Sequence, residues 1–328
     1  MLLRRIILPS ARAAGVLMLV GSSACGWPPF PGSAGFADIC PNASWSDVIA
    51  GYRSPAGLNS VFVTTNAIWA VGESGLVVTI QSGSAQECYL RSNSLKSVLV
   101  SGNKVFIAGG DGIFETQTTT PCKPDVPVVT ASCTDLWQEG DALFAACSAD
   151  VKFKSMQSGS WSPTVPVAAK RYNTVVSGGG RLVAGSTLKQ SYSTLLPPVT
   201  WTPFATRSSE LTDGWFDGQS TSYLVGSAGE LLRFDAGSGT ATDISSQLDT
   251  IAMGAEPRSI WGIGQKLYVV GLSAGAGSTG FVWESQQRSI LAESGVGYLS
   301  VHGTPRGVYI VGSQSGASTT GIIRCKSL

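Results

Sequence analysis

Short apolar runs recur along the chain at nearly constant intervals, and each run ends on a small residue. Six of them end on glycine, as IWAVG at 68–72 and VYIVG at 308–312 do, and LFAAC at 143–147 ends on a cysteine. The final residues of the seven runs lie at 72, 109, 147, 185, 226, 271 and 312. Intervals of 37 to 45 residues indicate a repeated structural unit.

Each unit contains further runs around this apolar core. A run such as Ser60-Val61-Phe62 precedes it by about ten residues, and an alternating run such as GLVVTIQ at 75–81 follows it. Alternation of apolar and polar residues is typical of a half-buried strand. Most units add a fourth run after a hairpin such as QSGS at 81–84. Four short strands every forty residues predict the blade of a β-propeller, because a sandwich does not repeat in register and a parallel β-helix has shorter rungs.

The sequence therefore predicts an all-β fold, a seven-bladed β-propeller of four-stranded antiparallel blades. The predicted blades are 57–91, 94–127, 131–166, 171–206, 210–246, 257–293, and 297–328 together with 43–48.

The last unit ends at Leu328 without a fourth run of its own. ASWSDV at 43–48 resembles two internal fourth runs, GSWSPTV at 159–165 and VTWTPF at 199–204. We therefore expect the N-terminal strand to join the last blade and close the ring, which also removes an exposed sheet edge.

The N-terminal residues have the features of an export signal. Arg4, Arg5 and Arg12 precede the apolar run 13–20, and small residues follow it, which predicts a signal peptide over 1–24. Residues 25–39 are expected to be a lipidated Cys25 and a Pro/Gly-rich tether, before a single propeller domain over 40–328. Ser23, Ala24 and Cys25 resemble the lipobox of bacterial lipoproteins, although Ser22 stands where that family usually has leucine.

Ordinary signal cleavage at the same bond is the second interpretation of this segment. Either interpretation predicts an exported protein, as an outer-membrane or cell-surface lipoprotein or in the periplasm.

The cysteines support an exported protein. Without Cys25, six of the seven remain, and an even number in an exported chain predicts disulfides. Ring closure would bring Cys40 beside Cys325, and Cys133 faces Cys147 across a hairpin. Elimination then pairs Cys88 with Cys122.

Composition excludes several classes of site. Charged residues make up 13% of the chain and the net charge is +1, so no basic stripe for nucleic acid is present. The chain has one histidine and no CxxC spacing, which argues against zinc, haem and iron–sulfur sites. We predict neither a metal nor a cofactor.

Three side chains are candidates for catalysis. His302 is a possible general base, but it occupies the position held by Phe62 and Trp261 in other units, which favours packing. Asp135 and Asp213 occupy a first-strand position that holds Ser or Thr elsewhere. They could form the carboxylate pair of a glycosidase, or they could satisfy backbone groups.

Charged residues cluster in the loops between the second and third strands of a unit and in the loops from a fourth strand to the next unit. We expect these two sets of loops to share one face of the propeller, which we call the loop face. The candidate binding residues there are Glu73, Asp111, Asp150, Glu230, Lys96, Arg171, Arg207 and Arg258. The alternative is a solvated surface on which charges of both signs are interspersed.

The unit at 60–83, SVFVTTNAIWAVGESGLVVTIQSG, resembles the repeat of photosystem II assembly factor-like and related secreted bacterial propellers. SMQSGSW at 155–161 resembles a degenerate Asp-box, the turn of sialidase-type (BNR-like) repeats, with Gln157 in place of the Asp. The first resemblance implies binding of protein partners and no catalysis. The basic patch of the photosynthetic members has no counterpart, so their role is not implied.

The leading functional hypothesis is a non-catalytic cell-envelope propeller that binds a protein or a glycan through the loop face. The alternatives are a carbohydrate-active hydrolase or lyase with carboxylates near the central channel, and a structural subunit of an envelope assembly.

Overall fold

The computed structural model describes most of the chain from Cys40 to Leu328. The described residues are 40, 42–123, 126–157, 159–164, 171–187, 190–197, 200–205, 210–248, 254–273, 279–286, 289–315 and 319–328. All of them belong to one compact unit, Ser33–Leu328. The expected signal peptide, Cys25 and the tether lie outside the described residues. None of the helices among these residues is long and apolar enough to cross a membrane.

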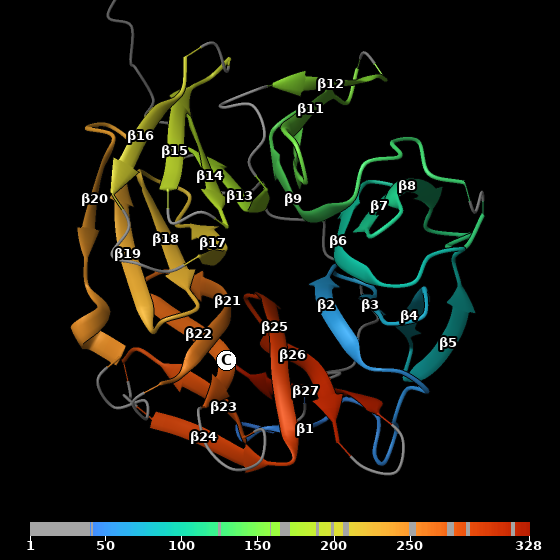
Figure 1. The fold of residues 1–328 in the computed structure, drawn as a ribbon. Helices are drawn as coiled ribbons and strands as arrows, with labels where there is room; N and C mark the ends of the chain where they lie inside the picture. Colours follow the sequence, from blue (N-terminus) through green and yellow to red (C-terminus); the bar gives the residue numbers. More distant parts are fainter. Residues whose placement is uncertain are drawn as a thin grey trace, which may run out of the picture. The chain divides into compact units, whose positions relative to one another are not determined.

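The fold is all-β, and its strands form antiparallel groups that follow one another along the chain (Figure 1). Group 1 holds β2 (Leu58–Val63), β3 (Ile68–Gly72), β4 (Leu76–Gln81) and β5 (Ser84–Tyr89). Group 2 holds β6 (Leu95–Ser101), β7 (Lys104–Gly109) and β8 (Gly112–Gln117). Group 3 holds β9 (Cys133–Glu139), β10 (Ala142–Cys147), β11 (Val151–Ser155) and β12 (Trp161–Thr164). Group 4 holds β13 (Tyr172–Gly178), β14 (Arg181–Ser186), β15 (Gln190–Leu195) and β16 (Thr202–Ala205).

The remaining groups complete the order. Group 5 holds β17 (Leu211–Phe216), β18 (Thr221–Gly226), β19 (Glu230–Asp235) and β20 (Thr240–Asp243), followed by a short 3₁₀ helix, Ser245–Leu248. Group 6 holds β21 (Glu256–Ile263), β22 (Lys266–Ser273), β23 (Thr279–Glu284) and β24 (Ser289–Ser294). Group 7 holds β25 (Val296–Thr304), β26 (Gly307–Gln314), β27 (Thr320–Ser327) and β1 (Ser46–Asp47). Groups 6 and 7 belong to one eight-stranded sheet, because Thr279 of β23 pairs in parallel with Val296 of β25.

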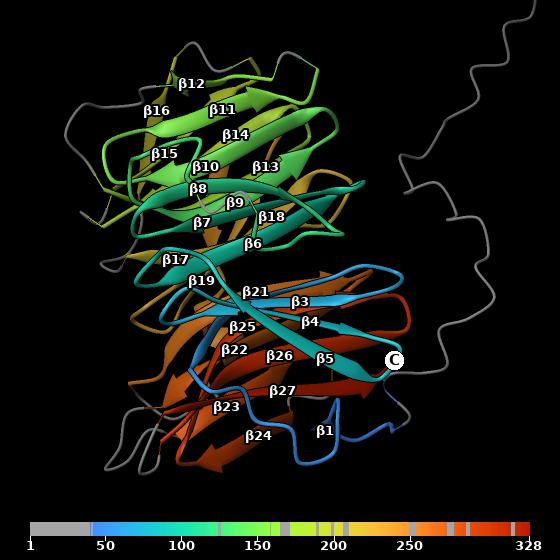
Figure 2. The same cartoon turned by 90° about the vertical axis from the view of Figure 1, so that its right-hand side faces the viewer.

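Burial decreases across a group from its inner strands to its outer strand. All five residues of β3 are buried, whereas β5 is mostly exposed. The first strands of consecutive groups lie beside one another, from β2 and β6 through to β21 and β25, and β25 in turn lies beside β2 (Figure 1). Figure 2 shows the groups from the side, with β25, β26 and β27 next to one another. Each group thus has a neighbouring group against which to bury its inner strands.

Apolar clusters fill the spaces between neighbouring groups. Trp69 of group 1 packs with Ile107 of group 2, and Trp261 of group 6 packs with Tyr298 of group 7. A further cluster contains Ile68 of group 1 and Val311 of group 7. Because a single group cannot bury both of its faces alone, these shared clusters are the main source of stability.

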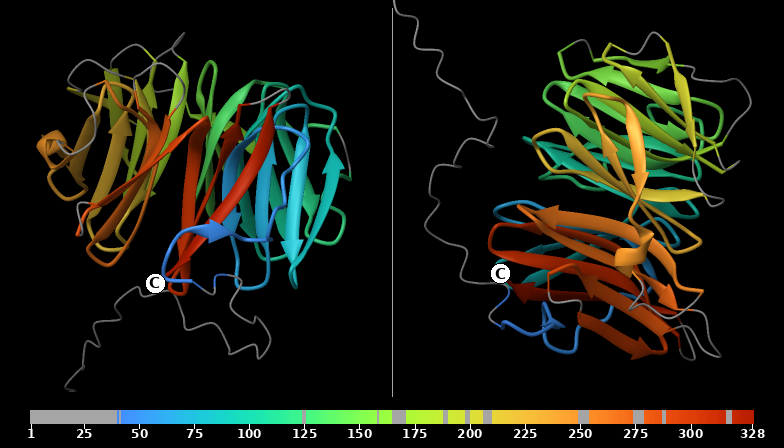
Figure 3. Two further views of the ribbon diagram at one scale, coloured as in Figure 1. Left: turned by 90° about the horizontal axis from the view of Figure 1, so that it is seen from below. Right: turned by 90° about the vertical axis from the view of Figure 1, so that its left-hand side faces the viewer.

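The N-terminal segment lies against the C-terminal strand, as the sequence predicts (Figure 3). Ser46 pairs with Cys325 and Asp47 with Arg324, and the amide of Val48 donates to the carbonyl of Ile323 at 3.1 Å. The strand β1 covers two residues, fewer than the expected 43–48. A disulfide joins Cys40 to Cys325 beside this pairing.

The other two disulfides also have the expected partners. Cys133 is bonded to Cys147 across the β9–β10 hairpin. Cys88 of β5 is bonded to Cys122, which lies after β8. This second bond attaches the segment that follows group 2 to the outer strand of group 1.

Group 2 departs from the four-stranded pattern predicted for 94–127. Its sheet has three strands, and the described residues between β8 and β9 make only isolated bridges, Gln117 with Thr120 and Ile113 with Val129. This segment carries prolines at 121, 124 and 127, which have no amide hydrogen to donate to a strand partner.

Candidate functional site

A one-residue bulge interrupts the first hairpin of every group at the same place. In group 1, Leu58 pairs with Gly72 and Ser60 with Val71, so Asn59 has no partner opposite it. The equivalent bulged residues of the other groups are Lys96, Thr134, Asn173, Thr212, Arg258 and Leu299. A bulge redirects a side chain at the end of a strand, so these residues form a structurally equivalent set.

The close approach of backbone at this bulge explains the recurrent glycine. A Cβ on Gly72 would lie 2.0 Å from the carbonyl oxygen of Gly57, and one on Gly312 would lie 1.8 Å from that of Gly297. No side chain fits at such distances without moving backbone. In group 3 Cys147 holds this position and is bonded to Cys133 opposite it, and in group 4 Ser186 holds it, because Gly185 pairs with Thr174 after the bulge.

The residue after the bulge makes hydrogen bonds between neighbouring groups. The Ser60 hydroxyl accepts a hydrogen bond from the Val98 amide of group 2 at 3.3 Å. Ser259 accepts in the same way from Val301 at 3.1 Å. Ser300 of group 7 accepts from Val61 of group 1 at 3.3 Å. These hydroxyls therefore satisfy buried backbone amides between groups, which is a structural role.

Asp135 and Asp213 make the same connection with two hydrogen bonds each, both to Oδ2. Oδ2 of Asp135 accepts from the Thr174 hydroxyl and from the Val175 amide, both at 2.9 Å. Oδ2 of Asp213 accepts from the Ser259 hydroxyl at 2.6 Å and from the Ile260 amide at 3.0 Å.

In each aspartate Oδ1 accepts from the amide of the following residue. Asp135 thus accepts from four donors, one of them the Ser97 hydroxyl of group 2 at 3.4 Å, and Asp213 accepts from three.

Burial changes the acidity of this pair. It raises the pKa of Asp135 to about 6. Burial, and then the negative charge of Asp135, raise the pKa of Asp213 to about 7. The two carboxyl groups thus interact electrostatically, as expected if both project from first strands toward the same interior. Because both carboxyl groups accept hydrogen bonds from buried backbone amides and neighbouring hydroxyls, they support the backbone-satisfying interpretation over the glycosidase interpretation.

His302 is a packing residue in this structure. Its ring lies 4.4 Å from that of Phe62 and 6.3 Å from that of Trp261, measured between centroids. The Nδ1 atom accepts a hydrogen bond from the Val63 amide at 3.2 Å, which requires an unprotonated Nδ1. Burial lowers the pKa of the imidazole to about 4, so the ring is neutral at pH 7. The side chain links group 7 to group 1.

The predicted loop-face residues of groups 1 and 2 lie together. Glu73 accepts from the bulged Asn59 at 2.9 Å and forms an ion pair with the bulged Lys96 at 3.3 Å. Partial burial opposes ionisation of Glu73, but the Asn59 amide and the Lys96 charge outweigh it and lower the pKa of the carboxyl. Asp111 is exposed and accepts from the Asn93 amide at 3.2 Å.

The other predicted acids differ in their surroundings. Asp150 lies immediately before β11 and forms an ion pair with Lys152 of that strand at 2.6 Å. Glu230 is 2% exposed at the start of β19, so its side chain is not available at the surface.

The predicted cations of the later groups lie at the first strands. Arg258 pairs with Glu256 at 2.5 Å, and both side chains are exposed. Arg171 is exposed just before β13. Arg207 lies outside the described residues.

The structure adds residues that the sequence did not single out. The bulged Asn173 donates to Glu210 at 3.3 Å, which repeats the contact between Asn59 and Glu73. Thr134 and Thr212 instead donate to carbonyls of the next group, Tyr172 and Pro257, at 2.9 Å. The bulged positions therefore include four polar or charged residues paired with acids, Asn59, Lys96, Asn173 and Arg258. Among the described residues, no cluster of three or more His, Cys, Asp or Glu could hold a metal ion.

No model of a protein family matches this chain, and no curated protein sequence does. Solved structures do match it. The structure described as YCF48 bound to D1 peptide superposes with a TM-score of 0.60 at 15% identity, over 85% of this chain and 94% of that chain. YCF48 from Cyanidioschyzon merolae gives a TM-score of 0.61 at 12% identity, over 87% of this chain and 99% of that chain.

The fold is that of a β-propeller. The resemblance to photosystem II assembly factor-like propellers is confirmed at the level of architecture, because both matched proteins are superposed along nearly their whole length. At these identities the likeness extends to the fold alone. The strand groups described above correspond to propeller blades, and the bulged residues stand where each blade's first strand begins.

Proposed function

We propose that this chain is a seven-bladed propeller, closed by its N-terminal strand, that binds a protein partner through the loop face and catalyses no reaction. Three contacts support closure: the pairing of β1 with β27, the Cys40–Cys325 disulfide, and the hydrogen bond that the Val61 amide donates to the Ser300 hydroxyl. The observation that carries the binding proposal is the exposed pairing of bulged cations with acids. The side chains of Lys96 and Arg258 are 41% and 38% exposed.

The matched structures agree with a protein partner. One of the two is YCF48 with a peptide bound, so a propeller of this architecture is known with a peptide ligand. The carboxylates that a hydrolase would use accept hydrogen bonds from backbone amides and hydroxyls in this chain. A glycan is the alternative ligand of the loop face, since paired acids and cations also hydrogen-bond hydroxyl groups.

We further propose that the protein is exported and attached to the cell envelope. Support comes from the arginines before the apolar run 13–20, from Cys25, and from the disulfides, which form in oxidising compartments. On this proposal residues 1–24 are removed, 25–39 act as the anchor and tether, and 40–328 form the propeller.

Reversing the charges of the loop face tests the binding proposal. The full-length protein is expressed in three forms, wild type, Lys96→Glu with Arg258→Glu, and Arg306→Glu. Arg306 is an exposed cation between β25 and β26, at the opposite ends of the strands, and serves as the matched control. Crosslinked partners are recovered in detergent and quantified by mass spectrometry.

We expect wild type and Arg306→Glu to retain the same partner, and the double variant to retain it at about one tenth of that level or less. Equal retention by all three proteins would remove the loop face from consideration. A glycan array probed with the same proteins separates the two ligand classes.

A further inference from the structure

The three disulfides that the structure describes differ in how accessible their sulfur atoms are. In the bond that joins the two ends of the domain and in the bond of the β9–β10 hairpin, each cysteine is at most 5% exposed. In the third bond, Cys88 and Cys122 are both half buried, and their neighbours Glu87, Tyr89 and Lys123 are exposed. Thiol–disulfide exchange requires a thiolate to reach a sulfur atom, so the Cys88–Cys122 bond is the one open to exchange in the folded protein.

The Cys88–Cys122 bond also holds a segment that no strand pairing joins to group 1. We call the described residues of 118–131 the post-β8 segment. Its hydrogen bonds lie within the segment or reach groups 2 and 3, as when the amide of Thr118 donates to the carbonyl of Asn103 at 2.9 Å. Among the described residues, no hydrogen bond joins the post-β8 segment to group 1. The disulfide is therefore the link between them, and its two cysteines pack against the apolar cluster that contains Trp69.

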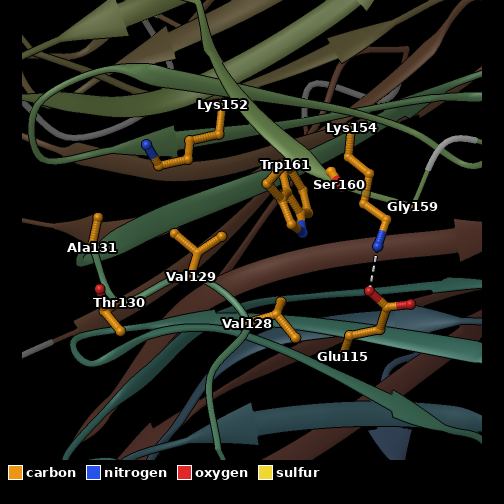
Figure 4. A pocket seen from close by; sticks show the side chains of 10 residues that line it. All are labelled: Glu115, Val128, Val129, Thr130, Ala131, Lys152, Lys154, Gly159, Ser160 and Trp161. Atoms are coloured by element: carbon orange, nitrogen blue, oxygen red, sulfur yellow. Dashed lines mark hydrogen bonds and ion pairs between the residues drawn. The ribbon is translucent and has the colours of Figure 1, made fainter.

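The same segment continues to the space between groups 2 and 3. The amide of Ile113 donates to the carbonyl of Val129 at 2.9 Å, and the amide of Val128 donates to the carbonyl of Ile113 at 2.7 Å. Val128 and Val129 line a cleft of about 580 Å³ together with Trp161 (Figure 4). A change in the position of the post-β8 segment would therefore alter one wall of this cleft.

We infer that the Cys88–Cys122 bond is a redox switch, which a dithiol opens and which thereby releases the post-β8 segment from group 1. One thiolate of the dithiol attacks a sulfur atom of the bond, forms a mixed disulfide and expels the other sulfur as a thiolate, which takes up a proton. The second thiol of the dithiol then displaces the remaining sulfur. The chain gains two electrons and two protons as two thiols, and the dithiol is oxidised to a disulfide.

The switch leaves the closure of the domain in place. The Cys40–Cys325 bond is buried and lies beside the pairing of β1 with β27, so it stays oxidised while the accessible bond is reduced. The inference does not depend on the loop face, so either proposal can fail without the other.

Titration of the folded full-length protein with dithiothreitol tests the order of reduction. Free thiols are alkylated at each concentration and located by peptide mass spectrometry. We expect Cys88 and Cys122 to become alkylated at a concentration about tenfold or more below that needed for the buried pairs. Thermal unfolding should still show a cooperative transition at that concentration. Reduction of a buried pair first, or of all three pairs together, would overturn the inference.

Hydrogen exchange of single amides, followed by NMR, tests whether the segment is released. In the reduced protein the amides of Ile113 and Lys123, which donate to carbonyls of the segment, should exchange about tenfold faster or more. The amides of Val48 and Val98 are internal controls, because they bond β27 and Ser60 away from the segment, and their exchange should not change.

Replacing Cys88 and Cys122 by serine separates loss of the bond from other effects of dithiothreitol. The double variant, without reductant, should exchange at Ile113 and Lys123 as fast as the reduced wild type, and it should shift the indole resonance of Trp161 in the same direction. Thermal unfolding checks that it folds. Slow exchange at both amides in the reduced protein and in the variant would show that the bond does not hold the segment, and would overturn the inference.

Discussion

At the scale of single residues, one position explains how the blades are held to one another. The serine, threonine or aspartate that follows each bulge has its side chain at the junction between groups. The sequence revealed this position as a repeated small polar residue, and it correctly offered backbone satisfaction as an alternative to catalysis for Asp135 and Asp213. It could not reveal how their acidity changes, because that depends on burial and on the distance between two distant parts of the chain.

Replacing Asp213 by serine, the residue at this position in four other groups, tests the role of its carboxyl group. The pKa of Asp213 is about 7 in the folded protein, against an ordinary value of 3.8. The folded state therefore binds the proton more tightly, and the free energy of unfolding must fall as pH rises between these values. The slope contributed by one such group is at most about 1.4 kcal/mol per pH unit.

Urea unfolding of wild type and Asp213→Ser from pH 4 to pH 8 measures this contribution. The free energy of unfolding of wild type minus that of Asp213→Ser should decrease as pH rises and become constant above about pH 7. His302 affects the free energy of unfolding with the opposite sign, because burial lowers the pKa of its imidazole and so favours the folded state at higher pH. Both proteins contain His302, so its effect is present in both curves. Parallel curves would contradict the raised pKa of Asp213.

At the scale of the strand, the repeat located the hairpins but not their irregularities. The seven apolar runs correspond to the second strands of the seven groups, from β3 to β26. The bulges were missed because an extra residue in a first strand leaves the apolar pattern of the second strand unchanged. Their sign in the sequence is the glycine that ends four of these runs, at 72, 109, 271 and 312, where a backbone carbonyl oxygen lies too close for a Cβ. The missing fourth strand of group 2 had a clearer signal in its three prolines.

The two adjacent glycines at the end of β7 test the role of this approach. A Cβ on Gly109 would lie 2.6 Å from the carbonyl oxygen of Ser94, whereas one on Gly110 would lie 3.9 Å from the same atom. Gly109→Ala should therefore lower the free energy of unfolding by about 1–3 kcal/mol, the range typical of overpacking. Gly110→Ala should change it little. Similar losses in both variants, measured by chemical denaturation, would mean that the approach does not explain the repeated glycine.

At the scale of the whole molecule, the repeat predicted the architecture, and it did so through the spacing of the units rather than through any single motif. The resemblance of 43–48 to internal fourth runs correctly indicated a partner strand for β27, although only Ser46 and Asp47 form it. The loop-face residues were predicted less well. Glu230 is buried although its charge suggested a surface position, because burial at a strand end is not visible in charge alone.

Removing one disulfide at a time tests how much the link between the two ends of the propeller domain contributes to its stability. The Cys40–Cys325 bond spans 285 residues and the Cys133–Cys147 bond spans 14. In the chain-entropy model, replacing both cysteines by alanine costs on the order of 5 kcal/mol for the first pair and about 3 kcal/mol for the second. Thermal and urea unfolding should therefore show the larger loss for Cys40→Ala with Cys325→Ala. An equal or smaller loss would show that the ends contribute little beyond the local strand pairing.

The pairing of β1 with β27 also has a consequence for how the protein is made. Group 7 takes one strand from residues 46–47 and three from residues 296–327. During synthesis the first of these segments appears long before its partners, so it must wait, unpaired, until almost all of these residues have emerged. Groups 1 to 6 draw their strands from consecutive residues and can assemble as they appear. The last step of folding is therefore set by the arrival of the C-terminus, and a chain that stalls before Cys325 leaves Cys40 as a free thiol.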